Sequence, residues 1–217
     1  MTSYVGNASA NMYPDRAVCE VFAHFTDGTW EQGTGVFVSA NDVLTASHML
    51  WQVDHGGEAD RVTVIPGANG SYQPYGQFEA AHWYNYQVAD GNDQITRQQS
   101  QYDVGIVSLG TREGDVVGWF GMDSNAHSGD YNLTGYPAKY GPNLMTNDFG
   151  HANTDGTYRV FDYTSIETNP GNSGGPLWYM GANGPMCVGI ASSSVCAAEI
   201  NGNFDTIQSW IRADGIW

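Results

Sequence analysis

The chain has 217 residues, of which 41% are hydrophobic and 14% are charged, and its 23 acidic against 7 basic residues give a formal net charge of −16. This length suffices for one large domain or for two small halves that share a core, and 28 glycines with 13 tyrosines are typical of an all-β protein with many tight turns. So acidic a surface repels nucleic acid and anionic lipid, which argues against both as partners.

Short apolar stretches recur along the chain, and each is bounded by Gly, Asn, Asp or Pro. Runs rich in Val, Ile, Phe and Tyr with such boundaries predict β-strands. The stretches interpreted as strands are 17–25, 35–39, 43–46, 61–65, 103–109, 131–136, 157–163 and 186–192. No apolar run is long enough to span a bilayer, and the first 16 residues lack the pattern of a signal peptide.

Two segments depart from this strand pattern. The polar segment 87–101 has no clear period and is predicted to be a surface loop. At the end of the chain Asn203 is a candidate N-cap, and Phe204, Ile207 and Ile211 then fall on one helix face. Strands followed by a single C-terminal helix do not show the strand–helix alternation of a parallel α/β sheet.

His48 is the candidate catalytic base. A predicted strand runs into it through the small residues of VLTASH, which leave room for the imidazole to meet a hydroxyl and a buried carboxylate. A lone histidine in such a place is more often structural. The remaining histidines lie in polar or aromatic surroundings and are interpreted as surface or packing residues: His24, His55, His82, His127 and His151.

Asp103 opens the apolar stretch DVGIVSL. A carboxylate at the start of a buried strand is costly unless it has partners, and an imidazole N–H is a suitable one because the carboxylate then fixes the tautomer. Taken alone, this residue would be read as a strand-capping Asp. Its catalytic interpretation depends on its occurrence together with His48 and Ser173, in the order His, Asp, Ser.

Ser173 lies in the hexapeptide GNSGGP, which starts at Gly171. Glycines allow a tight turn and a close approach of substrate to the backbone, so the N–H groups of Gly171 and Ser173 would face a developing oxyanion. An ordinary Gly-rich turn is the alternative. The hexapeptide also fits the G-x-S-x-G elbow of α/β-hydrolases, but all six histidines precede Ser173, and those enzymes place His after Ser.

Cys187 and Cys196 flank one apolar segment and are predicted to form a disulfide in an oxidising compartment, leaving Cys19 free. No Cys and His cluster has zinc-ligand spacing. The acidic residues at 90–93 lack the EF-hand pattern of calcium ligands. Neither a metal nor another cofactor is therefore predicted.

The segments TASH around His48, DVGIVSL from Asp103 and GNSGGP around Ser173 resemble the trypsin-like (chymotrypsin-fold) serine proteases. Three further stretches, GWFG, NLTGYP and FDYTSIET, are similar to the bacterial V8-like glutamyl-endopeptidase branch. The resemblance implies an all-β fold of two antiparallel six-stranded β-barrels with a C-terminal α-helix. We expect one peptidase domain over 1–217, with barrels at about 15–115 and 116–202 and the helix at about 203–213.

The same resemblance implies a secreted, monomeric serine endopeptidase that acts on proteins or peptides without a cofactor. His48 would be the general acid and base, Asp103 its orienting partner and Ser173 the nucleophile. Gly171 and Ser173 would form the oxyanion hole. A silent binding homologue is the alternative, although no triad residue or oxyanion glycine is missing, and an esterase is a third hypothesis.

The resemblance also assigns a substrate pocket. Ser192 would hydrogen-bond the buried Asp103. Ala191 stands where glutamyl endopeptidases place the His that holds the substrate carboxylate, which argues against glutamyl specificity, although Thr168 of that pattern is retained. Glu167 occupies the place of the residue at the pocket base in trypsin-like enzymes, where it would select Arg or Lys, unless it points to solvent. Ser194 would narrow the entrance and favour smaller side chains.

Overall fold

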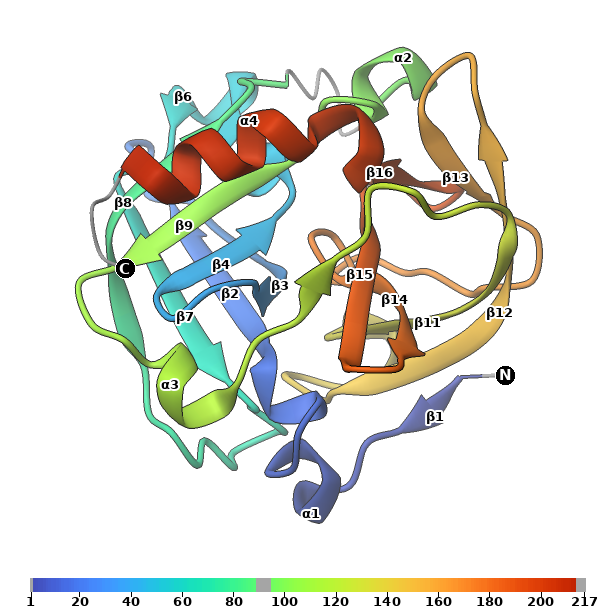
Figure 1. Ribbon diagram of the computed structural model, residues 1–217. Helices are drawn as coiled ribbons and strands as arrows, with labels where there is room; N and C mark the ends of the chain where they lie inside the picture. The colour runs from blue at the N-terminus through green and yellow to red at the C-terminus, as the bar shows by residue number, and fades with distance from the viewer. Residues whose placement is uncertain (1, 89–94, 214–217) are drawn as a thin grey trace.

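The first barrel is a closed ring of six strands with a buried apolar core. The computed structural model describes residues 2–88 and 95–213. In β2 (Val18–His24), Cys19, Val21 and Ala23 are fully buried, whereas Phe22 and His24 are half-buried. From β2 the ring continues through β3 (Trp30–Phe37), β4 (Asp42–Thr45), β9 (Gly105–Leu109), β8 (Phe78–Asn85) and β7 (Arg61–Pro66), and returns to β2 (Figure 1).

The second barrel is closed by one long strand that has two partners. The first part of β12 (Thr146–Asp155) pairs with β11 (Gly129–Gly135), and its last four residues pair with β13 (Val160–Tyr163). From β13 the ring runs through β16 (Cys196–Glu199), β15 (Gly184–Ala191) and β14 (Pro176–Gly181) back to β11. The two antiparallel six-stranded barrels that the sequence predicts are therefore confirmed, and they lie side by side (Figure 1).

Short elements decorate the two barrels. β1 (Ser3–Tyr4) pairs with β12, β10 (Gly121–Met122) runs parallel to β15, and β5 (Trp51–Gln52) pairs with β6 (Gly57–Glu58). The short helices are α1 (Asn7–Ala10), α2 (Arg97–Ser100), α3 (Gly114–Val117), η1 (Asp15–Ala17), η2 (Ser47–Met49), η3 (Val53–His55) and η4 (Ala138–Tyr140). In the part of the chain that the structure describes, no helix is both long and apolar enough to cross a membrane.

The predicted C-terminal helix is confirmed, but it begins earlier than expected. α4 (Ile200–Ala213) follows β16 directly, so Asn203 lies inside the first turn and is not the N-cap. Its side-chain amide donates hydrogen bonds to the backbone oxygens of Gln101 (2.9 Å) and Glu199 (2.8 Å). The buried Ile207 faces the core, and Trp210 stacks on Tyr84 of β8, which fixes the helix against the first barrel.

The predicted disulfide between Cys187 and Cys196 is wrong, because both thiols are free and buried, as is Cys19. Cys196 on β16 lies opposite Ser192, five residues beyond Cys187 along the neighbouring strand. Five extended residues span roughly 17 Å, whereas a disulfide needs Cα atoms within about 7 Å. Burial raises the pKa of Cys187 to about 12, so its thiol stays protonated.

Candidate active site

His48 and Asp103 meet because their strands are neighbours in the first barrel. β4 and β9 run antiparallel, with Thr45 opposite Gly105, so the end of β4 and the start of β9 share one edge of the barrel. His48 comes three residues after Thr45, in η2, and Asp103 comes two residues before Gly105. Residues 55 positions apart are thereby placed side by side.

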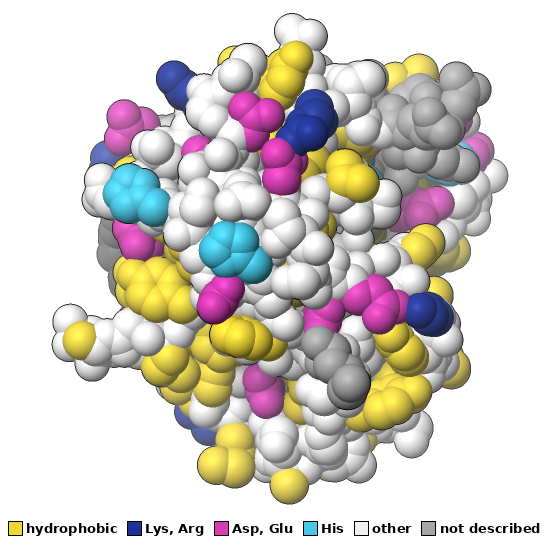
Figure 2. Space-filling model, turned by 90° about the vertical axis from the view of Figure 1, so that its right-hand side faces the viewer, with side chains coloured by type: hydrophobic (Ala, Val, Ile, Leu, Met, Phe, Trp, Pro, Cys, Tyr) yellow, Lys and Arg dark blue, Asp and Glu magenta, His cyan; other side chains and the backbone are white. Residues whose placement is uncertain are grey.

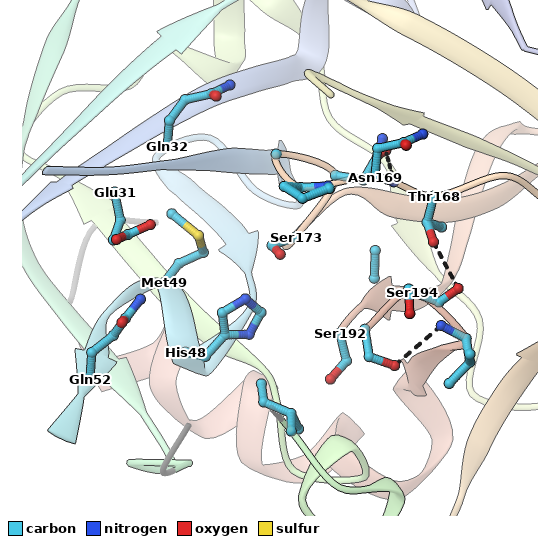
Figure 3. A pocket seen from close by; sticks show the side chains of 17 residues that line it. Glu31, Gln32, His48, Met49, Gln52, Thr168, Asn169, Ser173, Ser192 and Ser194 are labelled. Atoms are coloured by element: carbon cyan, nitrogen blue, oxygen red, sulfur yellow. Dashed lines mark hydrogen bonds between the residues drawn. The ribbon is translucent and has the colours of Figure 1, made fainter. Parts of the chain in front are cut away.

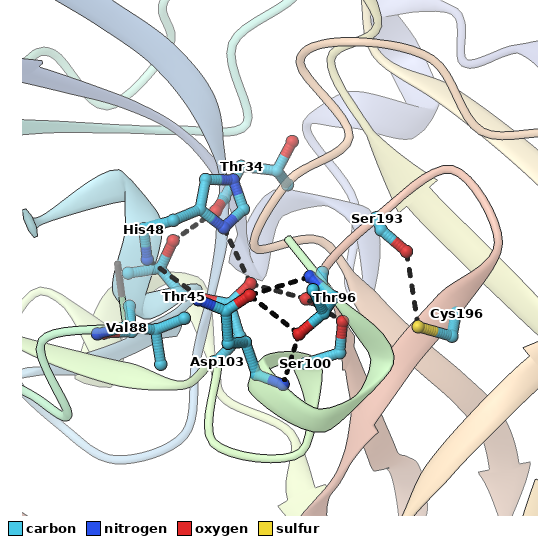
Figure 4. Close-up of polar contacts among 12 residues, drawn as sticks. Thr34, Thr45, His48, Val88, Thr96, Ser100, Asp103, Ser193 and Cys196 are labelled. Carbon is cyan, nitrogen blue, oxygen red and sulfur yellow. Dashed lines mark hydrogen bonds and ion pairs between the residues drawn. The ribbon is translucent and has the colours of Figure 1, made fainter. Parts of the chain in front are cut away.

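Two hydrogen bonds join these residues and fix the orientation of the imidazole (Figure 4). His48 Nδ1 lies 2.7 Å from Asp103 Oδ2, and the backbone N–H of His48 donates to Asp103 Oδ1 at 2.9 Å. Since the carboxylate only accepts, Nδ1 carries the proton and donates it to Asp103. Nε2 of the neutral ring is then left with its lone pair, which is the form that can accept a proton from a hydroxyl.

Burial distinguishes this pair from three other His–Asp pairs in the structure. The side chains of His48 and Asp103 are 10% and 0% exposed. In the other pairs the histidine is 23% to 43% exposed and the aspartate 42% to 63%: His24–Asp60, His55–Asp27 and His151–Asp130. Water screens exposed pairs of this kind, whereas the His48–Asp103 pair, alone among these four, is shielded from solvent.

Ser173 faces His48 from a loop of the second barrel that only glycine permits. Gly171 and Gly174 have φ values of +97° and +83°, a conformation that side-chain-bearing residues rarely adopt. A Cβ atom on Gly171 would overlap the backbone oxygen of Tyr136, and one on Gly174 would overlap that of Thr34. The loop therefore presses against both barrels, and it holds the Ser173 side chain opposite the imidazole (Figure 3).

The peptide planes of this loop orient two N–H groups. The oxygen of Pro170 accepts a hydrogen bond from Ala138 N at 2.9 Å, and the oxygen of Asn172 accepts one from Gly175 N at 2.8 Å. In a trans peptide the N–H points opposite to its C=O. The N–H groups of Gly171 and Ser173 are consequently directed away from these contacts, and both residues line the cavity beside His48.

The structure adds Thr34 of β3, which the sequence analysis missed. Its hydroxyl donates to the oxygen of Gly171 (2.7 Å) and accepts from Tyr136 N (3.1 Å), and its backbone N–H donates to the oxygen of Ser173 (2.8 Å). The only signal was a threonine between two glycines in an apolar strand. Such a hydroxyl needs a buried partner, but the sequence does not reveal which one.

Ser100 is a second residue that the sequence analysis missed. The predicted role of Ser192 matches the geometry, since its hydroxyl donates to Asp103 Oδ2 at 2.6 Å, and the buried Ser100 hydroxyl lies 3.1 Å from the Ser192 hydroxyl. Ser100 belongs to α2, which was expected to be part of a loop. Thr96 and Gln99 form a capping box that starts this helix, and the T-x-x-Q spacing was the available signal.

His48 and Ser173 stand in the middle of a cavity of about 590 Å³ (Figure 3). One wall carries Glu31, Gln32, Met49 and Gln52, and the opposite wall carries Thr168, Ser192 and Ser194. The chain neighbours of Ser192 and Ser194 also line the cavity: Ala191, Ser193 and Val195. Thr168 Oγ1 donates to the oxygen of Ser194 at 2.9 Å, which joins the two loop segments of that wall. Ala191 also belongs to the apolar core of the second barrel, so the pocket wall behind it is apolar.

Glu167 does not lie at the base of the pocket, so its predicted role in selecting Arg or Lys is wrong. The side chain is exposed and outside the cavity lining. It forms an ion pair with Lys139 and accepts hydrogen bonds from Tyr140 (2.9 Å) and Asn169 (3.2 Å). These partners lower the pKa of Glu167 to about 2, led by Lys139, and they turn the carboxylate toward solvent.

Metal ligands were not predicted from the sequence. Within residues 2–88 and 95–213, no group of three or more His, Cys, Asp or Glu side chains is arranged to hold a metal ion. The acidic residues at 90–93, which lack the EF-hand pattern of calcium ligands, lie outside the described residues.

Comparison with known proteins agrees with this geometry. The chain is 28% identical over 214 residues to the extracellular metalloprotease of Bacillus subtilis and 24% identical over 214 residues to the glutamyl endopeptidase of Bacillus licheniformis. These alignments cover 94% and 91% of this chain but only 66% and 64% of the relatives, so the chain spans about two thirds of their length.

Solved structures share the fold at low sequence identity. A Glu endopeptidase in complex with MPD superposes with a TM-score of 0.76 at 20% identity, over 98% of this chain and 96% of the other. The protease Anisep from Arthrobacter nicotinovorans superposes with a TM-score of 0.69 at 23% identity, over 85% and 90% of the two chains. The family model of the trypsin-like peptidase domain matches residues 33–185. The chain therefore belongs to the trypsin-like peptidase family.

Proposed function

We propose that this chain is a serine endopeptidase that cleaves peptide bonds in proteins through an acyl-enzyme. The observation that carries the proposal is the buried His48–Asp103 pair, with Nδ1 and Oδ2 2.7 Å apart, placed opposite Ser173 across one cavity. The loop around Ser173 also supports the proposal, because it directs the N–H groups of Gly171 and Ser173 away from the hydrogen bonds within the protein. Protease relatives agree with the reaction class.

In the proposed acylation step, Ser173 Oγ attacks the carbonyl carbon of the scissile bond while His48 Nε2 takes the hydroxyl proton. The N–H groups of Gly171 and Ser173 stabilise the oxyanion, and Asp103 stabilises the imidazolium. The C–N bond breaks when His48 returns the proton to the leaving amine. Water then attacks the ester, again with His48 as base, and the acid product and free Ser173 are released.

The walls of the cavity suggest which residue precedes the scissile bond. The wall formed by Thr168, Ala191 and Ser192–Val195 carries no charged side chain among the described residues. We propose that it accepts an uncharged side chain, since a charge buried there would lack a partner. This replaces the basic preference expected from Glu167.

The proposal extends to where the protein acts. The name of the Bacillus subtilis relative describes an extracellular protease, and we propose that the present chain is likewise secreted and acts as a monomer on protein substrates. Size-exclusion chromatography of the folded chain, together with detection in culture medium, would check both statements.

Labelling with a fluorophosphonate tests the mechanism. We expect stoichiometric modification at Ser173, identified by peptide mapping, and cleavage of casein that the label abolishes. Ser173→Ala should lower kcat by roughly four orders of magnitude or more while substrate binding survives, because the triad acts as a unit. Asp103→Asn should cause a comparably large loss by favouring the wrong tautomer of His48.

The controls separate the alternatives. A zinc chelator such as 1,10-phenanthroline should leave cleavage unchanged, which distinguishes this mechanism from that of a metalloprotease. A folded wild-type protein that is neither labelled nor cleaves casein would support a silent binding homologue and overturn the proposal. A protein that hydrolyses small esters but leaves casein uncleaved would instead support an esterase.

A further inference from the structure

One carboxylate lies in the cavity wall opposite the wall that is proposed to accept the residue before the scissile bond. Among the described residues that line the cavity, Glu31 is the only acidic one, and it lies on the same wall as Gln32, Met49 and Gln52 (Figure 3). His48 and Ser173 separate this wall from Thr168 and Ser194. The cavity is therefore uncharged at one end and negatively charged at the other.

The strand that carries Glu31 is anchored directly to the nucleophile loop. Thr34 N donates to the oxygen of Ser173 at 2.8 Å, and a Cβ atom on Gly33 would lie 2.8 Å from the same oxygen. Glu31 precedes Gly33 by two residues on β3, a distance of roughly 7 Å along an extended strand. A substrate bound in an extended conformation advances by a similar rise per residue. With its scissile bond at Ser173, its first or second residue after that bond therefore reaches Glu31.

The direction of the peptide follows from the proposed function, on which this inference rests. If the residues before the scissile bond occupy the wall of Thr168 and Ser194, the residues after it must leave the cavity past Met49 and Glu31. A long basic side chain at one of these positions would bring its charge to the Glu31 carboxylate.

The surroundings of Glu31 keep this end of the cavity negative. His55 Nε2 lies 3.8 Å from Glu31 Oε1, while His55 Nδ1 bonds to Asp27 at 2.8 Å. The pKa of His55 is raised, first by its hydrogen bond to Asp27 and further by the charges of Glu31 and Asp54. One imidazole thus faces three carboxylates, and even when protonated it does not cancel their charge.

We propose that Glu31 is a specificity-determining residue that favours substrates with Arg or Lys at the first or second position after the scissile bond. The sequence suggested that Glu167 selects Arg or Lys before the scissile bond. The present proposal instead assigns a preference for Arg or Lys to Glu31, on the side of the cavity that binds the residues after the bond.

A peptide library cut by the wild-type protein and read by mass spectrometry on both sides of each cleavage tests this. We expect enrichment of Arg and Lys at one of the two positions after the bond. For pairs of quenched peptides that differ only there, kcat/KM should favour Arg over Leu by roughly threefold to tenfold, as for one partly desolvated charge pair. The ratio should fall in 1 M NaCl, which screens the pair.

Variants then assign the preference to one carboxylate. Glu31→Gln should bring the Arg-to-Leu ratio close to one, and Glu31→Lys should favour Glu at the same position. Glu79→Gln, an exposed acid of the same barrel, and Glu167→Gln should leave the ratio unchanged.

The outcomes are distinguishable. Wild-type cleavage with equal kcat/KM for Arg, Leu and Glu after the bond, or a ratio that survives Glu31→Gln, would overturn this inference and leave the proposed function intact. Failure of the wild type to cleave any peptide would overturn the proposed function, and this inference with it.

Discussion

At the scale of single residues, one hydroxyl on the first barrel holds the loop of the second barrel that carries Ser173, the proposed nucleophile. Thr34 Oγ1 donates to the oxygen of Gly171 at 2.7 Å and accepts from Tyr136 N at 3.1 Å, and the residue is fully buried. The oxygen of Gly171 belongs to the peptide that follows one proposed oxyanion donor. The Thr34 hydroxyl therefore acts on the geometry of the proposed oxyanion hole without lying in the substrate's path.

Thr34→Val should impair turnover more than binding. The substitution keeps the shape but leaves the Gly171 oxygen and Tyr136 N without a partner, at a cost of roughly 1–3 kcal/mol in the free energy of unfolding. Because the Gly171 peptide can then rotate, kcat should fall about tenfold or more, while KM changes little. Urea unfolding and steady-state kinetics on one quenched peptide measure both effects.

Thr34→Ser is the matched control, since it retains the hydroxyl and removes one methyl group. It should keep most of the activity. If Thr34→Val has the kcat of the wild type, or if Thr34→Ser is equally impaired, the hydroxyl does not position the oxyanion loop.

At the scale of elements, β2 carries a carboxylic acid into the contact between barrels. Glu20 lies opposite Thr34 on β3 and Ile65 on β7, and it is fully buried. Among the described residues, Gln32 is the one side chain placed to hydrogen-bond its carboxyl group, and the contact is not close. Burial raises the pKa of Glu20 to about 7, and the nearby Gln32 offsets this only partly.

The consequence for stability has a definite sign. Between the ordinary pKa of 4.5 and about 7, the folded chain keeps the Glu20 proton that the unfolded chain loses. The free energy of unfolding should therefore be highest below pH 4.5 as far as this group is concerned, and should fall as the pH rises toward 7, by on the order of 3 kcal/mol. Burial raises the pKa of Glu199 to about 7 as well, which adds to the same decline.

Glu20→Gln should remove part of this pH dependence. We expect the variant to be more stable than the wild type at pH 8 and about equal to it at pH 4.5, as measured by urea unfolding at both pH values. Glu79→Gln removes one exposed carboxylate from the same barrel and reports the effect of net charge alone. A wild type whose stability is flat from pH 4.5 to 8, or a variant that declines equally, would contradict the assignment.

At the scale of the whole molecule, the hydrophobic pattern predicted a chain of β-strands with one C-terminal helix, and the resemblance to trypsin-like proteases implied the two barrels, but not every strand was predicted. Each predicted strand overlaps a barrel strand, whereas β8, β12, β14 and β16 were not predicted. The buried positions of β12 are Thr146, Asp148, Gly150 and Ala152, which are small or polar. Such a strand has no apolar alternation to detect, because its buried residues are held partly by polar contacts, as where Asp148 accepts a hydrogen bond from Glu167 N at 2.6 Å.

The candidate site shows the same division between local and non-local information. The residues proposed as the triad lie in short motifs, so the sequence could indicate them. The direction in which Glu167 points depends on Lys139, which lies 28 positions away and draws the carboxylate out of the pocket. Likewise, the separation of Cys187 from Cys196 depends on strand register, which spacing alone does not determine.

The net charge of −16 is also a property of the whole molecule. Figure 2 shows acidic side chains scattered over one face among uncharged ones, with few basic side chains between them. Several of the basic side chains are already paired with carboxylates, such as Arg97 with Asp162 and Arg112 with Asp115. Long-range repulsion between the remaining carboxylates therefore opposes folding.

Salt should consequently stabilise the protein. Raising NaCl from 0.01 M to 1 M shortens the Debye length from about 30 Å to about 3 Å, which screens repulsion across the surface more than it weakens pairs in contact. We expect Tm at pH 7 to rise over this range. Near pH 4.3, where the net charge approaches zero, the same salt should change Tm little, and this serves as the control for effects of salt unrelated to charge. A Tm at pH 7 that is highest in dilute buffer would show that local ion pairs outweigh the repulsion between like charges.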